Sequence, residues 1–267
     1  MLECGTVCPA CIQERKPGGT CWRPREGPGF RCHLRLPGLE DMSPDLARPL
    51  IGLASASPRR RELLGLTGWA VSNLPAGVDE VPLAGETAEV LARRLALAKA
   101  RAAAASPDGL AVTLGADTII VDGGRMMGKP ADAAEAAEML ERLRGGTHRV
   151  LTALALVDPR RGTELVELCE TAVPMRDYTR DEVAGYVASG SPLDKAGAYG
   201  IQDGGFQPVA LERLEGCFAN VMGLPLCHLV RGMRRLGHVP PADVPTACQE
   251  HTAYACRVFD RILREEV

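Results

Sequence analysis

The sequence predicts an α/β protein built on a mixed β-sheet with helices on its faces. From residue 49 onwards, short apolar runs typical of buried strands alternate with longer segments of helical periodicity. Residues 148–157 and 164–174 are two strand-like segments that follow each other closely enough to form an antiparallel hairpin, which argues against an all-parallel sheet. The composition agrees, because 46% hydrophobic and 24% charged residues are ordinary values for a globular protein.

Local signals predict the first strand and the first two helices. Leu50–Ala54 is a short apolar run, and Ser57 followed by Pro58 marks the start of the helix after it. Serine is a good N-cap, and proline at the first helical position loses no hydrogen bond because that N–H has no intrahelical partner. Residues 86–105 predict a longer, alanine-rich helix whose apolar side chains share one face.

A central strand and a third helix are expected next. Residues 110–116 are apolar, Asp117 interrupts them, and residues 118–121 continue the strand. Two glycines at positions 123 and 124 predict a turn. Residues 132–143 have helical periodicity, and the glycine pair that follows them ends the helix.

The hairpin is followed by two more helices. Residues 179–189 predict a helix that opens with a capping box, in which a threonine and a glutamate three residues later satisfy each other's backbone N–H groups. A glycine-rich loop covers residues 197–205. Residues 223–226 then lead into the last helix of the domain, which ends at about residue 236.

We expect three parts along the chain. Residues 1–48 are rich in Gly, Pro, Arg and Cys without periodicity and predict a disordered leader, and Met42 is an alternative start of translation. Residues 49–237 form the ordered domain. Residues 238–267 form a C-terminal extension, in which apolar side chains at helical spacing over 247–264 predict an amphipathic helix docked on the domain.

The ten cysteines raise the question of a metal site. Cys8 and Cys11 form a C-x-x-C pair, but the second close pair of a zinc site is missing, so free thiols in a leader are the favoured interpretation. In the extension, Cys248, His251 and Cys256 could share a metal. Packing of one helical face on the domain is the simpler explanation for these three residues.

The composition excludes several classes of function. A formal net charge of -3 argues against a protein that coats a polyanion, and 4% aromatic residues are too few for a base-stacking platform. No window approaches the roughly 18 apolar residues of a membrane span, and the N-terminal stretch lacks the apolar run of a signal peptide. We therefore expect a cytoplasmic protein that binds neither nucleic acid nor membranes, and a homodimer remains open.

Residues 55–60 predict an anion-binding site. The N-terminus of the expected helix leaves backbone N–H groups unpaired and carries the positive end of the helix dipole. Ser55, Ser57, Arg59 and Arg60 add hydroxyls and guanidinium groups, whose planar fork suits phosphate oxygens. The alternative is a capped helix with a solvated basic first turn, but basic residues at a helix start oppose the dipole, which favours a bound anion.

Asp117 is the candidate for acid–base chemistry. A carboxylate in an apolar strand is costly to bury unless it lies at an opening or is paired, and at an opening it can deprotonate water or hold a divalent metal. Asp79 and Glu80 form an acidic pair that can hold Mg²⁺ together with Asp117. Lys99 and Lys129 are further cations. The alternatives are a turn cap, a solvated acidic loop and two surface lysines.

Residues 194–202 predict a binding site for a nucleobase. Their glycines allow the backbone to approach a ligand closely. Gln202 carries both a donor and an acceptor, which match the N3–H and a carbonyl of uracil or thymine. A freely rotating amide would match cytosine equally well, so selectivity requires neighbours that lock Gln202 in one orientation.

Together these motifs resemble the Maf family of nucleotide pyrophosphatases from Leu50 to about Leu236. The motifs that carry the resemblance are Ser55-Ala-Ser57-Pro-Arg59-Arg60, Asp79-Glu80, Lys99 within Ala-Lys-Ala, Gly115-Ala-Asp117-Thr118, Gly128-Lys129-Pro130, Lys195-Ala-Gly-Ala-Tyr-Gly-Ile-Gln202 and Gly223-Leu-Pro-Leu226. The resemblance implies an elongated α/β fold, related to inosine triphosphate pyrophosphatases, with a mixed sheet and a cleft between two lobes. It also implies hydrolysis between the α and β phosphates with a divalent cation, Mg²⁺ or Mn²⁺.

The resemblance also implies a role for each matched residue. Asp117 corresponds to the proton acceptor, and Glu80 lies with it on the metal side. Substrate choice falls to Arg60, Thr118 and Gln202. Phosphate contacts fall to Ser55, Arg59, Lys99 and Lys129, and the local pattern adds Ser57 to them.

The residues after Asp117 and in the glycine-rich stretch resemble the branch of the family that acts on dTTP and UTP. A house-cleaning hydrolase for these triphosphates is therefore expected. The alternatives are a pyrophosphatase for 7-methyl-GTP or another modified purine, a non-catalytic nucleotide-sensing regulator of division, and a zinc-dependent nucleic-acid module built on the leader cysteines. Asp203–Gln207, inserted directly after Gln202, departs from the family pattern and can reshape the base pocket.

Overall fold

The computed structural model describes residues 49–105 and 109–264 and confirms the mixed α/β fold. The sheet has six strands in the order β2-β1-β3-β5-β6, and β4 pairs with β3. The strands are β1 (Leu50–Leu53), β2 (Ala70–Asn73), β3 (Val112–Asp122), β4 (Arg125–Met127), β5 (Thr147–Asp158) and β6 (Thr163–Pro174). β1 is parallel to β2 and β3, whereas β3 is antiparallel to β4 and β5, and β5 to β6.

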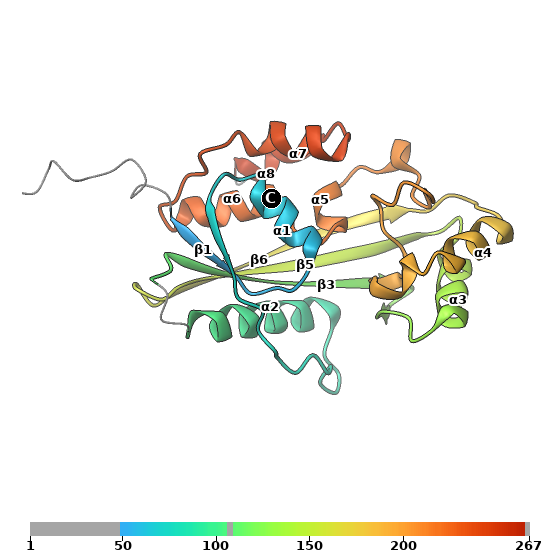
Figure 1. Cartoon of the computed structure of the whole chain (residues 1–267), viewed down its shortest axis with the longest axis horizontal. Coiled ribbons are helices and arrows are strands. Elements are labelled where there is room, and N and C mark those ends of the chain that lie inside the picture. Colours follow the sequence, from blue (N-terminus) through green and yellow to red (C-terminus); the bar gives the residue numbers. More distant parts are fainter. Residues whose placement is uncertain (1–48, 106–108, 265–267) are drawn as a thin grey trace, which may run out of the picture. The chain divides into compact units, whose positions relative to one another are not determined.

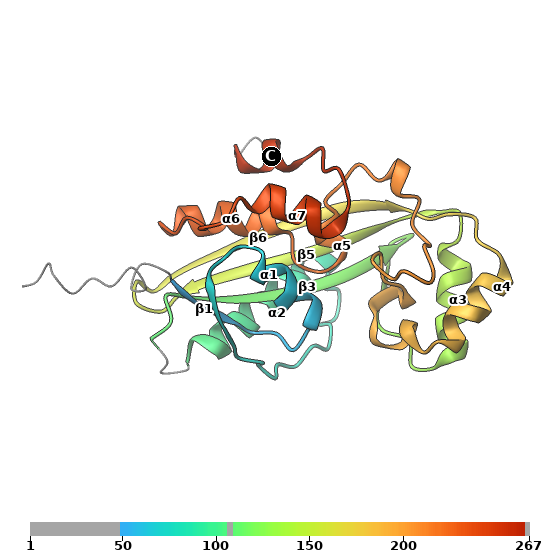
Figure 2. The same ribbon diagram turned by 45° about the horizontal axis from the view of Figure 1, so that its top comes forward.

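Helices cover both faces of this sheet. They are α1 (Pro58–Gly65), α2 (Ala88–Ala104), α3 (Ala133–Leu143), α4 (Arg180–Ala188), α5 (Phe218–Val221), α6 (Leu226–Arg235), α7 (Val244–Thr252) and α8 (Phe259–Leu263). α2 packs on β3 and β5 from one face, and α5 and α6 pack on β5 and β6 from the other (Figure 1). α3 and α4 pack on each other, and α7 lies beside α6 (Figure 2). None of the helices within the described ranges combines the length and apolarity needed to cross a membrane.

The helix caps and the glycine turn predicted from the sequence lie where they were expected. Ser57 is the N-cap of α1 and accepts a hydrogen bond from the backbone N–H of Arg60, with proline in the first turn. Thr179 and Glu182 form the complete capping box of α4. Gly123 and Gly124 have φ angles of 54° and 83° and connect β3 to β4, a left-handed pair of conformations that glycine adopts without steric cost.

Side chains of β3 point alternately to the two faces of the sheet. Leu114 and Ala116 belong to the apolar core on the α6 side, whereas Ile119 and Val121 pack with α2. Asp117 has the same parity as Ile119 and therefore lies on the α2 side. Its neighbour along the strand, Thr118, has the opposite parity and points to the other face, so the two polar residues approach the edge of the sheet from opposite sides.

A gap in the strand pairing exposes this part of β3. β1 pairs with β3 only as far as Leu114, and β4 begins to pair with it at Ile120. Between these two points, β3 has no strand neighbour on that side within the part of the chain that the structure describes. This edge of β3 therefore faces an opening beyond the carboxyl end of β1, the position where open α/β sheets bind ligands, and Thr118 and Ile120 line that opening.

The prediction of one continuous helix over residues 247–264 is wrong. α7 begins earlier, with Asp243 as its N-cap, and ends at Thr252, before Ala253, whose φ of 49° is left-handed. The chain then turns before α8 begins, and in this turn Tyr254 donates its hydroxyl hydrogen bond to the Leu214 carbonyl (2.5 Å). The expected leader, including Met42 and the C-x-x-C pair, lies outside the described residues.

Candidate functional site

A polar cleft of about 430 Å³ lies at the gap in the sheet. Part of its lining comes from the turn between β1 and α1, from the loop after β2, and from α2 and α5. The rest comes from the segment after β4 and from the loop after α4. The predicted site residues that line it are Ser55, Ser57, Arg59, Arg60, Glu80, Lys99, Thr118, Lys129 and Gln202. Asp117 does not itself line the cleft, but its carboxylate accepts a hydrogen bond from Lys99, which does.

Lys99 joins the two predicted carboxylates. Its Nζ lies 2.7 Å from Asp117 Oδ1 and 2.6 Å from Glu80 Oε1. The side chains of Lys99 and Asp117 are only 10% and 11% exposed, whereas that of Glu80 is 63% exposed. The Lys99–Asp117 pair is therefore shielded from solvent, where its attraction is stronger than at a surface, and Glu80 contacts it from the mouth of the cleft.

The meeting of Lys99 and Asp117 depends on Gly115. A Cβ placed on Gly115 would lie 2.1 Å from the carbonyl oxygen of Ala96 and 2.6 Å from the amide nitrogen of Ala100. The backbone of α2 therefore lies directly against β3 at this point, with no room for a side chain. Lys99 belongs to the same turn of α2, and Asp117 is two residues further along the same face of β3, so the close approach brings the two side chains together.

Burial has the largest influence on Asp117 and raises the pKa of its carboxyl above the ordinary value, while Lys99 and Arg60 act in the opposite direction. A carboxylate with a raised pKa holds a proton more strongly than an exposed aspartate. That property suits a group that must accept a proton from water near neutral pH.

Arg60 is held by three hydrogen bonds within the protein. Its Nε donates to the Gly223 carbonyl (2.9 Å), Nη1 to Ser55 Oγ (3.3 Å) and Nη2 to Thr118 Oγ1 (3.0 Å). The side chain thus connects α1 to β3 and to the segment after α5. Burial lowers the pKa of Arg60, but a guanidinium group still remains charged in a protein. Arg61, the next residue, is exposed.

Two residues behind Arg60 and Thr118 were not predicted. Thr152 Oγ1 lies 2.9 Å from Thr118 Oγ1 and donates to the Asn220 carbonyl (3.2 Å). The side-chain amide of Asn220, which is fully buried, donates to the Val150 carbonyl and to Thr171 Oγ1, both at 2.9 Å. A threonine inside the apolar strand predicted over residues 148–157 was the only sequence signal for this network.

The three remaining predicted residues have fewer partners. Arg59 Nη2 lies 3.8 Å from Asp194 Oδ2 across the cleft. Lys129 and Gln202 are exposed, and neither side chain has a hydrogen bond or ion pair with another described residue. Their polar groups are therefore available to a ligand in the cleft.

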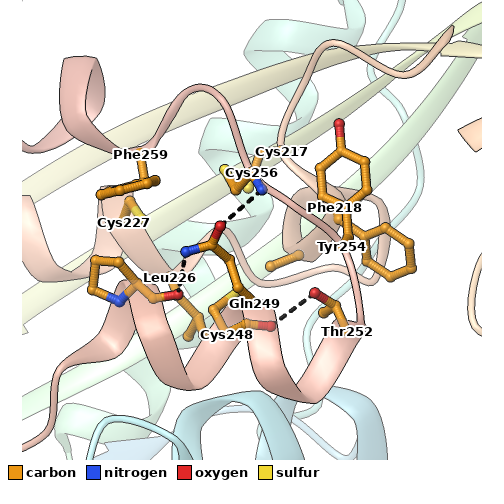
Figure 3. Close-up of a pocket in the computed structure, with 12 residues that line it drawn as sticks. Cys217, Phe218, Leu226, Cys227, Cys248, Gln249, Thr252, Tyr254, Cys256 and Phe259 are labelled. Carbon is orange, nitrogen blue, oxygen red and sulfur yellow. Dashed lines mark hydrogen bonds between the residues drawn. The ribbon is translucent and has the colours of Figure 1, made fainter. Parts of the chain in front are cut away.

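A second cavity, of about 20 Å³, lies between α6 and the C-terminal helices (Figure 3). Four cysteines line it, two from the domain and two from the extension: Cys217, Cys227, Cys248 and Cys256. Across the described ranges, no three His, Cys, Asp or Glu residues are arranged to hold a metal ion, and His251 lies 3.6 Å from Glu62 instead. The alternative of a metal shared by Cys248, His251 and Cys256 is therefore wrong. The extension packs on the domain through apolar side chains, among them Val244, Val258 and Leu263, and through hydrogen bonds such as that of Tyr254.

Comparison with known proteins gives a family match. Residues 50–236 match the Maf family, described as Maf-like protein. A dTTP/UTP pyrophosphatase of Citrifermentans bemidjiense is 46% identical over 187 residues, which cover 70% of this chain and 95% of that protein. A dTTP/UTP pyrophosphatase of Moorella thermoacetica is 50% identical over 174 residues, covering 65% and 88%. Among solved structures, the Ham1 protein of Staphylococcus aureus matches 48% of this chain and 72% of its own, with 15% identity and a TM-score of 0.36.

Proposed function

The chain belongs to the Maf-like protein family, and we propose that it is a nucleoside triphosphate pyrophosphatase that hydrolyses dTTP and UTP to the monophosphate and pyrophosphate. The names of the two relatives support this reaction and these substrates. The observation that carries the proposal is the shielded carboxylate of Asp117, which forms an ion pair with Lys99 beside the cleft. Arg59, Arg60 and Lys129 also line this cleft. A triphosphate chain is the kind of ligand that such a set of cations attracts.

We assign the phosphate contacts to the start of α1 and to the lysines. Ser55 Oγ accepts from Ser57 N–H (3.2 Å) and from Arg60, and Ser57 Oγ accepts from Arg60 N–H (3.5 Å). Because both hydroxyls act as acceptors in these contacts, their own protons remain free to donate to phosphate oxygens. Arg59, Lys99 and Lys129 would then neutralise the charge of the triphosphate.

Asp117 is the proposed proton acceptor. A water molecule next to its carboxylate would lose a proton to Asp117 as its oxygen forms a bond to the α phosphorus. The bond between that phosphorus and the bridging oxygen to the β phosphorus breaks, and pyrophosphate leaves with the bonding electron pair. The contact with Lys99 keeps the carboxylate oriented and limits the rise in its pKa.

The carboxylates fit a divalent metal that the substrate helps to bind. Glu80 and Asp117 both reach a single atom, Lys99 Nζ, so the two carboxylates approach the same point and are the residues that would hold one cation. The described part of the chain contains no group of three metal-binding side chains. Mg²⁺ is commonly held by one or two carboxylates plus substrate phosphates, which matches this donor set. When bound, the ion would neutralise charge on the phosphates.

Base selection is proposed to involve Arg60, Thr118 and Gln202. The free amide of Gln202 offers a donor and an acceptor to the pyrimidine edge, as uracil and thymine require.

All described cysteines are free thiols, in keeping with a reaction in the reducing cytoplasm.

Arg60→Ala is expected to weaken binding of a non-hydrolysable dTTP analogue by about 2 kcal/mol, because the charge-assisted contact between the guanidinium group and the triphosphate is lost. The protein should also unfold at lower urea concentration, since the Gly223 carbonyl and Thr118 lose their donor. Calorimetric titration and urea unfolding measure the two effects. Arg61→Ala is the matched control, because that exposed neighbour should change neither. An Arg60 variant that binds the analogue as wild type does would remove Arg60 from the site.

A panel of triphosphates tests the proposed function directly. Pyrophosphate release from dTTP, UTP, CTP, GTP and 7-methyl-GTP is measured with Mg²⁺ and with Mn²⁺. We expect dTTP and UTP to have the highest kcat/KM. If 7-methyl-GTP has the highest kcat/KM, the enzyme is instead specific for modified purines. Tight binding without any pyrophosphate would support a nucleotide sensor instead of an enzyme.

A further inference from the structure

The turn that carries Gln202 is bound at both ends by a single tyrosine. Asp203 N–H donates to the Gly200 carbonyl (3.3 Å), which closes a four-residue turn with Gln202 at its third position. Tyr186 OH, from α4, accepts a hydrogen bond from Gly200 N–H (3.2 Å) and donates one to Asp203 Oδ2 (2.5 Å). The first and last residues of the turn are therefore connected through one phenol.

The carboxylate of Asp203 has further polar partners. Ser191 Oγ donates to its Oδ2 (2.9 Å), and Lys195 Nζ lies 3.5 Å from the same oxygen. Lys195 is itself buried, and its Nζ donates to the Ser191 carbonyl (2.6 Å) and to Asp194 Oδ1 (2.7 Å). A charged acceptor shared by a phenol, a hydroxyl and a nearby ammonium group is a strong local anchor.

Two more contacts fix the segment that follows. Phe206 stacks on Tyr186 with ring centroids 4.5 Å apart and meets Tyr178 edge to face at 5.2 Å. Burial and the hydrogen bond to Asp203 raise the pKa of Tyr186, so its hydroxyl keeps the proton that it donates. A Cβ on Gly200 would lie 2.4 Å from Asp203 Oδ1, so only glycine leaves room for this arrangement.

We propose that Asp203 is a positioning residue for nucleobase selection, whose carboxylate holds the turn that presents Gln202 to the base. The inference rests on the proposed function, in which Gln202 reads the pyrimidine edge. No described residue binds the Gln202 amide, so within the protein only the backbone of the turn fixes the point from which this side chain enters the cleft, and the base completes the orientation of the amide. Asp203 also opens the predicted insertion after Gln202.

Loosening the turn should cost selectivity more than rate. In Asp203→Asn the side chain keeps its shape but loses the charge that Lys195, Ser191 and Tyr186 satisfy. Gln202 would then enter the cleft from more positions, including positions from which its amide can meet cytosine. Tyr186→Phe removes the hydroxyl that connects both ends of the turn and should act in the same direction.

The experiment compares the wild type with Asp203→Asn and Tyr186→Phe. Asp181→Asn is the matched control, because Asp181 lies on the same helix as Tyr186 and is exposed. Steady-state kcat and KM are measured for dTTP, UTP and CTP, and amide hydrogen exchange is followed over residues 199–205. In both test variants we expect the kcat/KM preference for dTTP over CTP to fall about tenfold through KM, with kcat within about threefold. The Gly200 and Asp203 amides should exchange at least about tenfold faster.

Three results are distinguishable. Wild-type selectivity in both variants, or unchanged exchange in the turn, overturns the positioning role while the proposed function stands. A wild-type protein that hydrolyses none of the triphosphates overturns the proposed function and base selection by Gln202 with it. If Asp203→Asn does not fold, Tyr186→Phe decides alone, because it removes one hydroxyl and leaves the buried charges paired.

Discussion

Asp117→Asn should lower kcat for dTTP by about 10³-fold or more and leave the affinity for a non-hydrolysable dTTP analogue within a few-fold of wild type. The amide has nearly the shape of the carboxylate but cannot accept a proton from water. Lys99 keeps its second partner, Glu80, so the cluster loses one charge without leaving the ammonium unpaired. Rapid-quench measurement of pyrophosphate, together with calorimetric titration of the analogue, separates the chemical step from binding.

The pH profile gives an independent check of the same assignment. The base acts only when deprotonated, so kcat/KM must fall as the pH drops through the pKa of Asp117. Because burial raises that pKa, the fall should begin at higher pH than for an ordinary aspartate. The residual activity of Asp117→Asn should lack this limb.

Asp122→Asn is the control for that experiment. Asp122 ends the same strand but forms an ion pair with Arg142 (2.6 Å) and does not line the cleft. Its loss should cost a little stability and no turnover. Near wild-type kcat in the Asp117 variant, or an equal loss in the Asp122 variant, would exclude Asp117 as the base.

Signals that act over a few residues were predictable from the sequence. Ser57 with Pro58 begins α1, and the capping box of Thr179 begins α4, because each cap is satisfied within one helical turn. The long antiparallel hairpin of β5 and β6 followed from its apolar periodicity. In contrast, β2 and β4 have only four and three residues and contain polar side chains, so neither stands out as an apolar run in the way that the equally short β1 does.

The composition of the cleft was largely predictable, but its internal contacts were not. The predicted cations and hydroxyls line one cleft. Ser55, Ser57 and Arg59 were recognisable from the strand-to-helix turn that carries them, whereas Lys99 and Thr118 lie inside α2 and β3 and were recognised from their motifs. Arg60 donates hydrogen bonds to Gly223, Ser55 and Thr118. Gly223 and Thr118 lie far from Arg60 in the chain, so no local pattern predicts these contacts. The end of α7 before Ala253 was missed for a similar reason: Tyr254, which follows it, binds the carbonyl of Leu214, a residue far away in the chain.

Gly115→Ala is expected to destabilise the protein by about 3 kcal/mol, because the new methyl group would overlap the backbone of α2. The nearest atoms are the Ala96 carbonyl oxygen and the Ala100 amide nitrogen, which belong to the helix backbone and cannot rotate away as a side chain would. Relief requires α2 to move away from β3, which carries Lys99 away from Asp117. We therefore expect kcat/KM to fall by about tenfold or more even under conditions where the variant remains folded.

Urea unfolding gives the loss of stability, and turnover measured at a temperature well below the unfolding transition gives the effect on the site. Gly65→Ala is the matched control, since a Cβ at Gly65, the last residue of α1, meets no atom within 4 Å. That variant should be as stable as wild type or slightly more so, because alanine favours the helix. If Gly115→Ala matched Gly65→Ala in both stability and turnover, the close packing of α2 on β3 could not be what brings the ammonium and the carboxylate together.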